Sequence, residues 1–226
     1  MRSFFPLLLA AALSAAAPKA VIIVALGDST TAGAPYFRSP VEAPPDGEGD
    51  ASAPFPRALE KLRPGWRALN RGVSGERADQ VRARFERDVL AEKPRFAVIL
   101  AGVNDVYQGR GLKETEADLL WMYERARRAG IEPIAATVMP FTRATPAQNA
   151  RLRALNGWIA RTAAERGLAL WDARAATASP GNPEALTGSP DGLHPDRAGY
   201  RAAARALAAV LDARLKSAEG RTSLPR

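Results

Sequence analysis

The sequence predicts one α/β domain, in which a parallel sheet of five strands carries helices on both faces. Three observations support this fold class. The chain has 226 residues, which is enough for one well-buried core and few for two. Hydrophobic residues make up 46% and charged residues 25%, as in globular proteins. Short apolar runs alternate with longer amphipathic segments, which is the pattern of parallel strands joined by crossover helices.

The expected elements follow from that alternation. Apolar runs of strand length cover residues 21–26, 66–69, 96–101, 134–138 and 168–171. Amphipathic segments of helical length cover residues 55–62, 78–91, 115–129, 146–166 and 195–215. The order of these segments predicts a strand followed by a helix, repeated along one domain that covers residues 18–226.

Several helix boundaries carry their own signals. Thr115 and Thr145 are the expected N-caps of two helices, because a hydroxyl can accept a hydrogen bond from a free N–H of the first turn. Pro146 suits a first helical turn, where no N–H is needed. Gly130 and Gly167 are expected at helix ends, because glycine adopts the left-handed conformation that stops a helix.

Two segments interrupt the alternation. Residues 33–56 are rich in proline, glycine and acidic residues, so they predict a long surface loop inserted into the domain. A lid or a wall of the substrate site is a second interpretation of this insertion, because it directly follows the first strand and its turn. Residues 177–191 are also expected to form a loop.

The N-terminal residues 1–17 predict a signal peptide. Arg2 precedes an apolar stretch over residues 4–13, and small residues follow at 14–17. This layout predicts cleavage near Ala16, a secreted or periplasmic protein, and no stable membrane insertion after cleavage. The alternative is an uncleaved anchor, but Pro18 and Lys19 interrupt the apolar stretch, which is short for a membrane span.

Charge and cysteine content exclude several classes of function. The formal net charge is +8, but most basic residues alternate with acidic ones on expected helices, so no nucleic-acid partner is predicted. The chain has no cysteine, which excludes disulfides, thiolate metal sites and a cysteine nucleophile. Asp28, Asp105 and Asp172 follow strands and offer a magnesium site as a minor alternative, but neither a metal nor an organic cofactor is expected.

Polar residues follow the expected strands at the edge where parallel sheets bind their ligands. Ser29 follows the first strand, Gly72 the second and Asn104 the third. His194 is the only histidine, and Asp191 precedes it by three residues within a polar turn. Such a spacing lets a carboxylate orient one imidazole nitrogen while the other accepts a proton from a hydroxyl.

A serine nucleophile is the function that uses these residues together. Ser29 would attack an acyl carbon, His194 would be its base, and Asp191 would orient the imidazole. The backbone N–H groups of Ser29 and Gly72 and the side-chain amide of Asn104 would stabilise the oxyanion. Taken singly, each has an ordinary structural role: a helix cap, a turn glycine, an Asx-turn or a surface histidine.

The motifs resemble those of the SGNH (GDSL) hydrolase family. They are G-D-S at 27–29, N-x-G at 70–72, G-x-N-D at 102–105 and D-x-x-H-P at 191–195, and they extend over almost all of the chain after residue 17. The resemblance implies a three-layer, flavodoxin-like α/β/α sandwich. It also implies a serine ester hydrolase with Ser29, His194 and Asp191 as catalytic residues and Ser29, Gly72 and Asn104 around the oxyanion.

The expected function is therefore a serine-dependent carboxylic ester hydrolase that acts on short-chain acyl or acetyl esters through an acyl-enzyme. A lysophospholipase or thioesterase acting on longer acyl chains is the alternative within the same class. An alternative of another class is a non-catalytic module that binds glycans or phosphate on the same fold. The expected partner is a small-molecule, glycan or lipid ester, and nothing in the sequence sets the oligomeric state.

Overall fold

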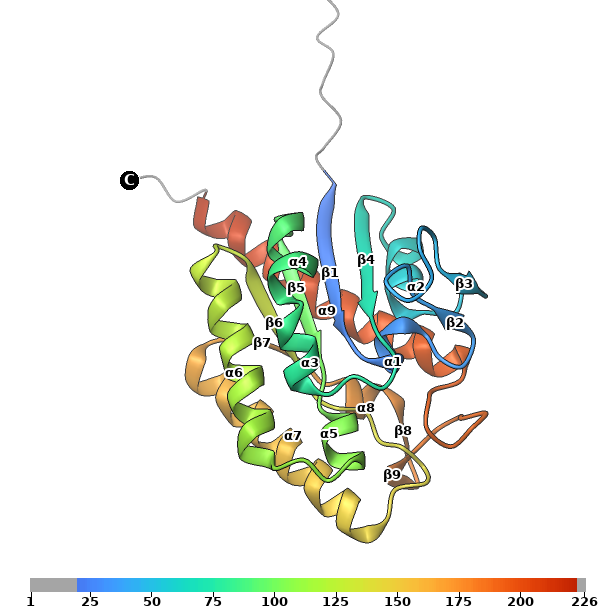
Figure 1. Cartoon of the computed structure of the whole chain (residues 1–226). Helices are drawn as coiled ribbons and strands as arrows, with labels where there is room; N and C mark the ends of the chain where they lie inside the picture. The colour runs from blue at the N-terminus through green and yellow to red at the C-terminus, as the bar shows by residue number, and fades with distance from the viewer. Residues whose placement is uncertain (1–19, 223–226) are drawn as a thin grey trace, which may run out of the picture.

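The computed structural model describes residues 20–222 (Figure 1). The expected signal peptide at residues 1–17 lies outside this range. Among the described residues, no helix is both long and apolar enough to cross a membrane.

A parallel sheet of five strands forms the centre of the fold. The strands are β1 (Val21–Gly27), β4 (Trp66–Gly72), β5 (Phe96–Leu100), β6 (Glu132–Ala136) and β7 (Ala169–Trp171), in the spatial order β4-β1-β5-β6-β7. The chain moves from β1 to one neighbour and then returns to the other side of β1. Beyond the carboxyl end of β1 this reversal opens a crevice, the usual ligand position in such sheets.

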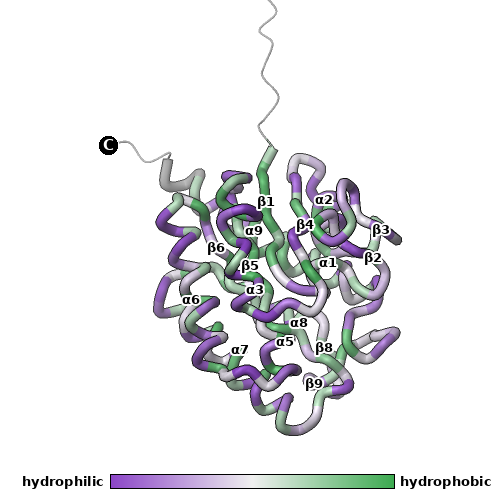
Figure 2. Tube along the Cα trace, viewed as in Figure 1, coloured by the Kyte–Doolittle hydropathy of each residue, from purple (hydrophilic) through white to green (hydrophobic). Residues whose placement is uncertain are grey.

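Helices cover both faces of this sheet, so the predicted three-layer α/β/α architecture is confirmed (Figure 1). On one face, Val24 and Leu26 of β1 share a core with helices α3 (Ala78–Ala83), α4 (Phe85–Asp88), α6 (Leu112–Arg128) and α7 (Pro146–Arg166). On the other face, Ile23 and Ala25 pack with α2 (Phe55–Leu62) and α9 (Arg197–Thr222). Figure 2 shows the hydrophobic colour along β1, as expected for a strand with helices on both sides.

Strong local signals set the bounds of two helices at the predicted residues. Helix α7 begins after Thr145, whose hydroxyl accepts from Gln148 N while Gln148 caps Thr145 N in return. It ends at Gly167, which has a left-handed φ of 61°. Helix α2 also covers the predicted range, with proline near its start.

Other boundaries differ from the prediction. The helix expected over residues 78–91 is split into α3, α4 and the 3₁₀ helix η1 (Leu90–Glu92), with a break at Arg84. Helix α6 begins after Gly111, and Thr115 is not its N-cap. The hydroxyl of Thr115 is instead 3.0 Å from Asp105 Oδ1, inside the protein. Helix α9 starts later than residue 195 and runs beyond residue 215.

The insertion at residues 33–56 has more structure than a plain loop. Strands β2 (Phe37–Arg38) and β3 (Glu48–Gly49) form a short antiparallel pair within it. The buried Ser39 donates its hydroxyl hydrogen to Gly72 O at 2.5 Å, and Glu42 Oε1 accepts from Ser74 N at 2.8 Å. The insertion is therefore docked on residues 72–74, which are the last residue of β4 and the two residues after it.

The segment expected as a loop at residues 177–191 also contains regular structure. Helix α8 (Ala173–Thr177) leads into strands β8 (Ala178–Ser179) and β9 (Asn182–Leu186), which pair antiparallel to each other. The turn with Asp191 and His194 follows and leads into α9.

Candidate active site

A tight turn presents Ser29 at the carboxyl end of β1. Strand β1 ends at Gly27, where a Cβ atom would overlap the carbonyl oxygen of Leu100, so the turn requires glycine. Asp28 caps helix α1 (Ser29–Ala32) by accepting a hydrogen bond from Thr30 N at 2.9 Å. Ser29 is thus the first residue of α1, and its backbone N–H has no acceptor among the described residues.

Three side chains form a continuous line of hydrogen bonds from the turn before α9 to this serine. His194 Nε2 lies 2.8 Å from Ser29 Oγ, and His194 Nδ1 lies 2.7 Å from Asp191 Oδ2. The other oxygen of Asp191 accepts from the backbone N–H groups of Leu193 at 2.8 Å and His194 at 2.9 Å. The turn that carries Asp191 and His194 is therefore held by the same carboxylate that contacts the imidazole.

The charge of Asp191 sets the roles of the imidazole nitrogens. Partial burial raises the pKa of this carboxyl, but hydrogen bonds from the His194 side chain and from the backbone outweigh it and lower the pKa to about 2. Asp191 is therefore ionised near neutral pH, and an ionised carboxylate only accepts hydrogen bonds. Nδ1 must then carry its proton toward Asp191, which leaves Nε2 free to accept the hydroxyl proton of Ser29.

Asn104 brings a side-chain amide to the cavity of Ser29 and His194. It belongs to helix α5 (Val103–Tyr107), which follows Gly102 with its φ of 123°. One amide hydrogen of Asn104 goes to Glu76 O, with a nitrogen-to-oxygen distance of 2.9 Å. The side chain lines the same cavity as Ser29 and His194, and its second amide hydrogen can serve a ligand there.

Gly72 does not lie where the sequence predicted. Its N–H donates to Asn70 Oδ1 at 3.1 Å, and Gly72 is not among the residues that line the cavity. It packs against α1 instead, because a Cβ atom here would overlap Ala32 N and lie 2.7 Å from Asp28 O. The expectation that Gly72 faces the substrate is therefore corrected.

Gly75 takes the place that was expected for Gly72. It lines the cavity, has a left-handed φ of 79°, and its N–H has no acceptor within residues 20–222. A signal for it was present in the sequence, because the Ser-Gly pair at 74–75 marks a turn just beyond the end of a strand.

The cavity beside Ser29 has a volume of about 270 Å³. Ser29, Asn104 and His194 form its polar end, and its other walls include Val103, Tyr107, Phe141 and Leu193. Behind Val103 and Leu193 lies a separate space of about 10 Å³, which has room for about one water molecule.

Comparisons with known proteins show the family of this chain. The model of the GDSL-like lipase/acylhydrolase family matches residues 25–202, from β1 into α9. The chain belongs to this family. The sequence-based identification as an SGNH (GDSL) hydrolase is confirmed, and the protein is a carboxylic ester hydrolase.

Solved structures of other GDSL proteins share the fold of this hydrolase. A protein of the G-D-S-L lipolytic family from Desulfitobacterium hafniense is 24% identical, with a TM-score of 0.69 over 84% of this chain and 99% of that one. An acetylxylan esterase from Geobacillus stearothermophilus is 25% identical, with a TM-score of 0.66 over 84% of this chain and 93% of that one.

A curated relative shows a shorter similarity. It is a lipoprotein of Bacillus subtilis called YqeF, whose function is not characterised, and it is 33% identical over 78 residues. The matched part is 32% of this chain and 32% of the relative. The chain therefore spans about a third of the length of that relative.

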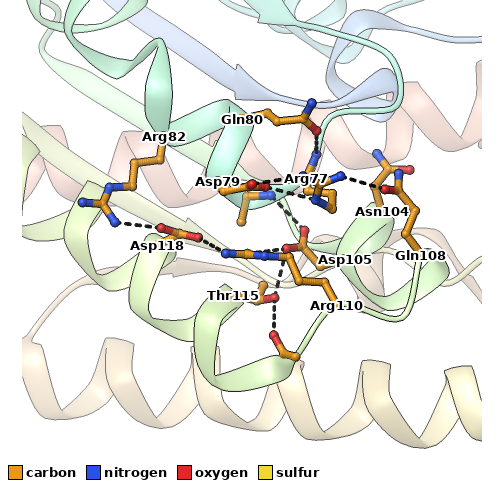
Figure 3. A network of polar contacts seen from close by, with 12 residues as sticks. Arg77, Asp79, Gln80, Arg82, Asn104, Asp105, Gln108, Arg110, Thr115 and Asp118 are labelled. Carbon is orange, nitrogen blue, oxygen red and sulfur yellow. Dashed lines mark hydrogen bonds and ion pairs between the residues drawn. The ribbon is translucent and has the colours of Figure 1, made fainter.

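A polar network fixes the segment with Gly75 to helix α5 of this GDSL-like hydrolase (Figure 3). At one end, Gln108 donates to Gly75 O at 3.2 Å and accepts from Arg77 at 3.1 Å. At the other end, the fully buried Asp105 accepts from Ala78 N at 2.8 Å. One end of residues 75–78 is therefore tied to α5 itself, and the other to Gln108, the residue directly after α5.

A second part of the network closes around Asp105. Figure 3 shows the guanidinium of Arg110 between Asp105 and Asp118, with nitrogen-to-oxygen distances of 2.8 and 2.7 Å. Asp105 was considered as a metal ligand from the sequence, but its oxygens already bind Arg110, Ala78 N and Thr115. Asp172 accepts from Thr137 and Ala175 N elsewhere in the fold. In residues 20–222, no three His, Cys, Asp or Glu side chains are arranged to hold a metal ion.

Arg84 connects the strand before Ser29 with the segment that holds Asn104. Its side chain is only 7% exposed and donates to Gly27 O at 2.8 Å and to Glu76 Oε2 at 2.7 Å. The same Glu76 accepts from Asn104 through its backbone oxygen. Sequence reasoning missed this role, because the bonds of Arg84 join residues far apart along the chain.

Proposed function

We propose that this hydrolase is a serine-dependent esterase that cleaves short-chain acyl or acetyl esters through an acyl-enzyme. Ser29 Oγ attacks the ester carbonyl while its proton passes to His194 Nε2. The imidazolium, stabilised by Asp191, then gives this proton to the leaving alcohol. Water attacks the acyl-enzyme with His194 as base, which releases the acid and restores Ser29. The continuous contact from Asp191 through His194 to Ser29, at the polar end of the cavity, is the observation that carries this proposal.

Three hydrogen-bond donors support the oxyanion step. The N–H groups of Ser29 and Gly75 lack acceptors among the described residues, and Asn104 has a second amide hydrogen at the same cavity. Donors that are already in place when negative charge develops lower the barrier, because they need no reorganisation. Gly75 replaces Gly72 in this proposal.

The small volume of the space beside the serine supports a short acyl group. The space of about 10 Å³ behind Val103 and Leu193 cannot take an alkyl chain, and the main cavity of about 270 Å³ must also hold part of the alcohol. An acetyl group, as in the name of the Geobacillus relative, satisfies this limit. The longer acyl chains of a lysophospholipase or thioesterase substrate need more space than an acetyl group.

Initial rates on p-nitrophenyl esters, from acetate to palmitate, test the proposal. We expect the highest kcat/KM on acetate or butyrate and a loss of on the order of 10³-fold or more in Ser29→Ala. Ser217→Ala, on the exposed surface of α9, is the matched control and should retain the wild-type rate. A peak at palmitate would overturn the short-chain assignment, and equal rates in the wild type and Ser29→Ala would overturn the serine mechanism.

The non-catalytic alternative predicts a different set of results. A module that only binds glycans or phosphate would show no serine-dependent turnover on any ester and no labelling by a serine-directed phosphonate. An esterase should show serine-dependent turnover and labelling by the phosphonate, because the contact between Ser29 and His194 makes the hydroxyl nucleophilic.

We also propose that the protein is exported by the signal peptide at residues 1–17. The support is the sequence pattern, together with the lipoprotein description of the relative from Bacillus subtilis. Mass spectrometry of the intact protein after expression in a bacterial host should find an N-terminus near Ala17 in the exported fraction. A chain that keeps Met1 at the membrane would indicate an uncleaved anchor instead.

A further inference from the structure

An exposed aromatic ring stands at the rim of the catalytic cavity. Tyr107, the last residue of α5, is 58% exposed and lines the cavity together with Ser29. Among the described residues, Leu62 is the other large hydrophobic residue classed as exposed, and it lies away from this cavity. A single exposed apolar residue is ordinary on a protein surface. Tyr107 is notable for its position, three residues after the candidate oxyanion donor Asn104.

The surrounding structure holds this ring in place. The ring of Phe141 contacts it edge-to-face, with centroids 6.0 Å apart and an angle of 71° between the planes. Phe141 itself is 1% exposed, so it gives Tyr107 a rigid support. A ring that is already ordered loses little conformational freedom when a ligand packs on it, which favours its use as a binding surface.

A polar side chain lines the same cavity as the ring, and the two segments are adjacent, because Gln108 after Tyr107 donates to Gly75 O at 3.2 Å. Ser74 lines the cavity, and its hydroxyl has no hydrogen-bond partner within residues 20–218. Its backbone is fixed, because Ser74 N donates to Glu42 Oε1 at 2.8 Å. An exposed aromatic ring and a free hydroxyl in one cavity suit a ligand with an apolar ring face and hydroxyls around its edge. A pyranose ring has this chemistry, whereas an alkyl chain would gain most from an enclosed apolar tunnel.

We propose that Tyr107 is a specificity-determining residue that binds a pyranose ring in the alcohol part of the ester. The apolar face of the sugar packs on the exposed face of Tyr107, and the Ser74 hydroxyl hydrogen-bonds a sugar hydroxyl. The acyl group then lies at Ser29, in the same cavity. This inference rests on the proposed esterase function and extends it to acylated carbohydrates.

The test compares two acetate esters that differ only in their alcohol: a monoacetylated methyl pyranoside and ethyl acetate. Acid release at constant pH gives kcat/KM for both, and the readout is the ratio of the pyranoside value to the ethyl acetate value. We expect Tyr107→Ala to lower this ratio about five- to tenfold, mainly through KM for the pyranoside. Tyr107→Phe keeps the ring face and should keep the ratio within about twofold. Leu62→Ala is the control for loss of an exposed apolar side chain and should leave both values unchanged.

Binding without turnover gives a second readout. In the Ser29→Ala background, calorimetry should give a Kd for the acetylated pyranoside that rises about five- to tenfold when Tyr107→Ala is added. An unchanged Kd would overturn the inference.

The outcomes separate this inference from the proposed function. A wild-type protein that cleaves neither ester would contradict the esterase function itself. A wild-type protein that cleaves ethyl acetate but has no preference for the pyranoside would leave the esterase standing and overturn the role of Tyr107. An equal loss on both esters in Tyr107→Ala would also overturn it, because the ring would then act only by supporting the site.

Discussion

The buried carboxyl of Asp28 should make the stability of the protein depend on pH in a direction opposite to that of most aspartates. Asp28 is 1% exposed, and burial raises its pKa from the ordinary 3.8 to about 6, although the Thr30 N–H and His194 oppose part of this effect. The folded state therefore binds this proton more tightly than the unfolded chain. At low pH, Asp28 is protonated in both states and does not change the free energy of unfolding. As pH rises from about 4 to 6, Asp28 lowers the free energy of unfolding by a growing amount.

Asp28→Asn removes this penalty while it keeps the helix cap, because asparagine can accept the Thr30 N–H bond equally well. A difference of about two pKa units corresponds to roughly 3 kcal/mol at pH values above 6. The free energy of unfolding of Asp28→Asn, relative to the wild type, should therefore rise by about 2–3 kcal/mol between pH 4 and pH 7. Titrating groups that do not interact with Asp28 act equally in both proteins and cancel in this difference.

Urea unfolding at a series of pH values measures this difference directly. Asp50→Asn is the matched control, and its effect on stability should have the opposite dependence on pH. Hydrogen bonds from Ser52 and Arg197 lower the pKa of Asp50 to about 2. Asp50 adds stability that is present above pH 4 and is lost as pH falls toward 2, so its removal should cost more at higher pH. If the free energies of unfolding of Asp28→Asn and the wild type change in parallel from pH 4 to 7, burial does not dominate the pKa of Asp28 and the argument is refuted.

Three further predictions concern the site. Gly72→Ala should lower the free energy of unfolding by about 2 kcal/mol or more in urea, because its Cβ atom would overlap Ala32 N; a change below about 0.5 kcal/mol would contradict the packing against α1. Asn104→Ala should lower kcat about 10²–10³-fold with a smaller change in KM, as measured on p-nitrophenyl acetate, whereas a pure KM effect would mean that Asn104 does not contact the oxyanion. Asp191→Asn should lower kcat on the order of 10³–10⁴-fold and leave the circular dichroism spectrum unchanged, since an amide would favour the wrong imidazole tautomer; a loss below about tenfold would remove Asp191 from the mechanism.

Local sequence signals were sufficient where one segment determines its own conformation. Helix α7 was predicted to its ends, because Thr145, Pro146 and Gly167 are cap and stop residues that act within one turn. The five strands and the layers were also predictable, because each strand is a short apolar run. The family could be named from motifs at the strand ends, since those residues occur in a fixed order.

Long-range bonds explain most of the differences between prediction and structure. The helix expected at 78–91 breaks at Arg84, whose guanidinium reaches Gly27 O, 57 residues earlier in the chain. The hydroxyl of Thr115 hydrogen-bonds Asp105 inside the protein, so Thr115 does not cap its helix. Periodicity and propensity carry no information about such partners, because both are read within a single segment.

The choice between Gly72 and Gly75 as the glycine of the site could not be made from the sequence. Gly72 is the last residue of β4 and Gly75 lies three residues beyond it, and on sequence grounds either could present a backbone N–H to a ligand. The distinction depends on α1, which packs on Gly72, and on the docked insertion, in which Ser39 and Glu42 hold residues 72–74. These contacts join three separate segments and became visible only in the folded chain.

Covalent labelling of Ser29 tests the central claim most directly. The protein is treated with a fluorophosphonate, and peptide mass spectrometry locates the adduct while the rate of labelling is followed by intact mass. The account predicts one adduct per chain, on Ser29, with labelling slowed about 10³-fold or more in His194→Ala. An adduct on another serine, or a labelling rate unaffected by His194→Ala, would contradict the claim that His194 activates Ser29.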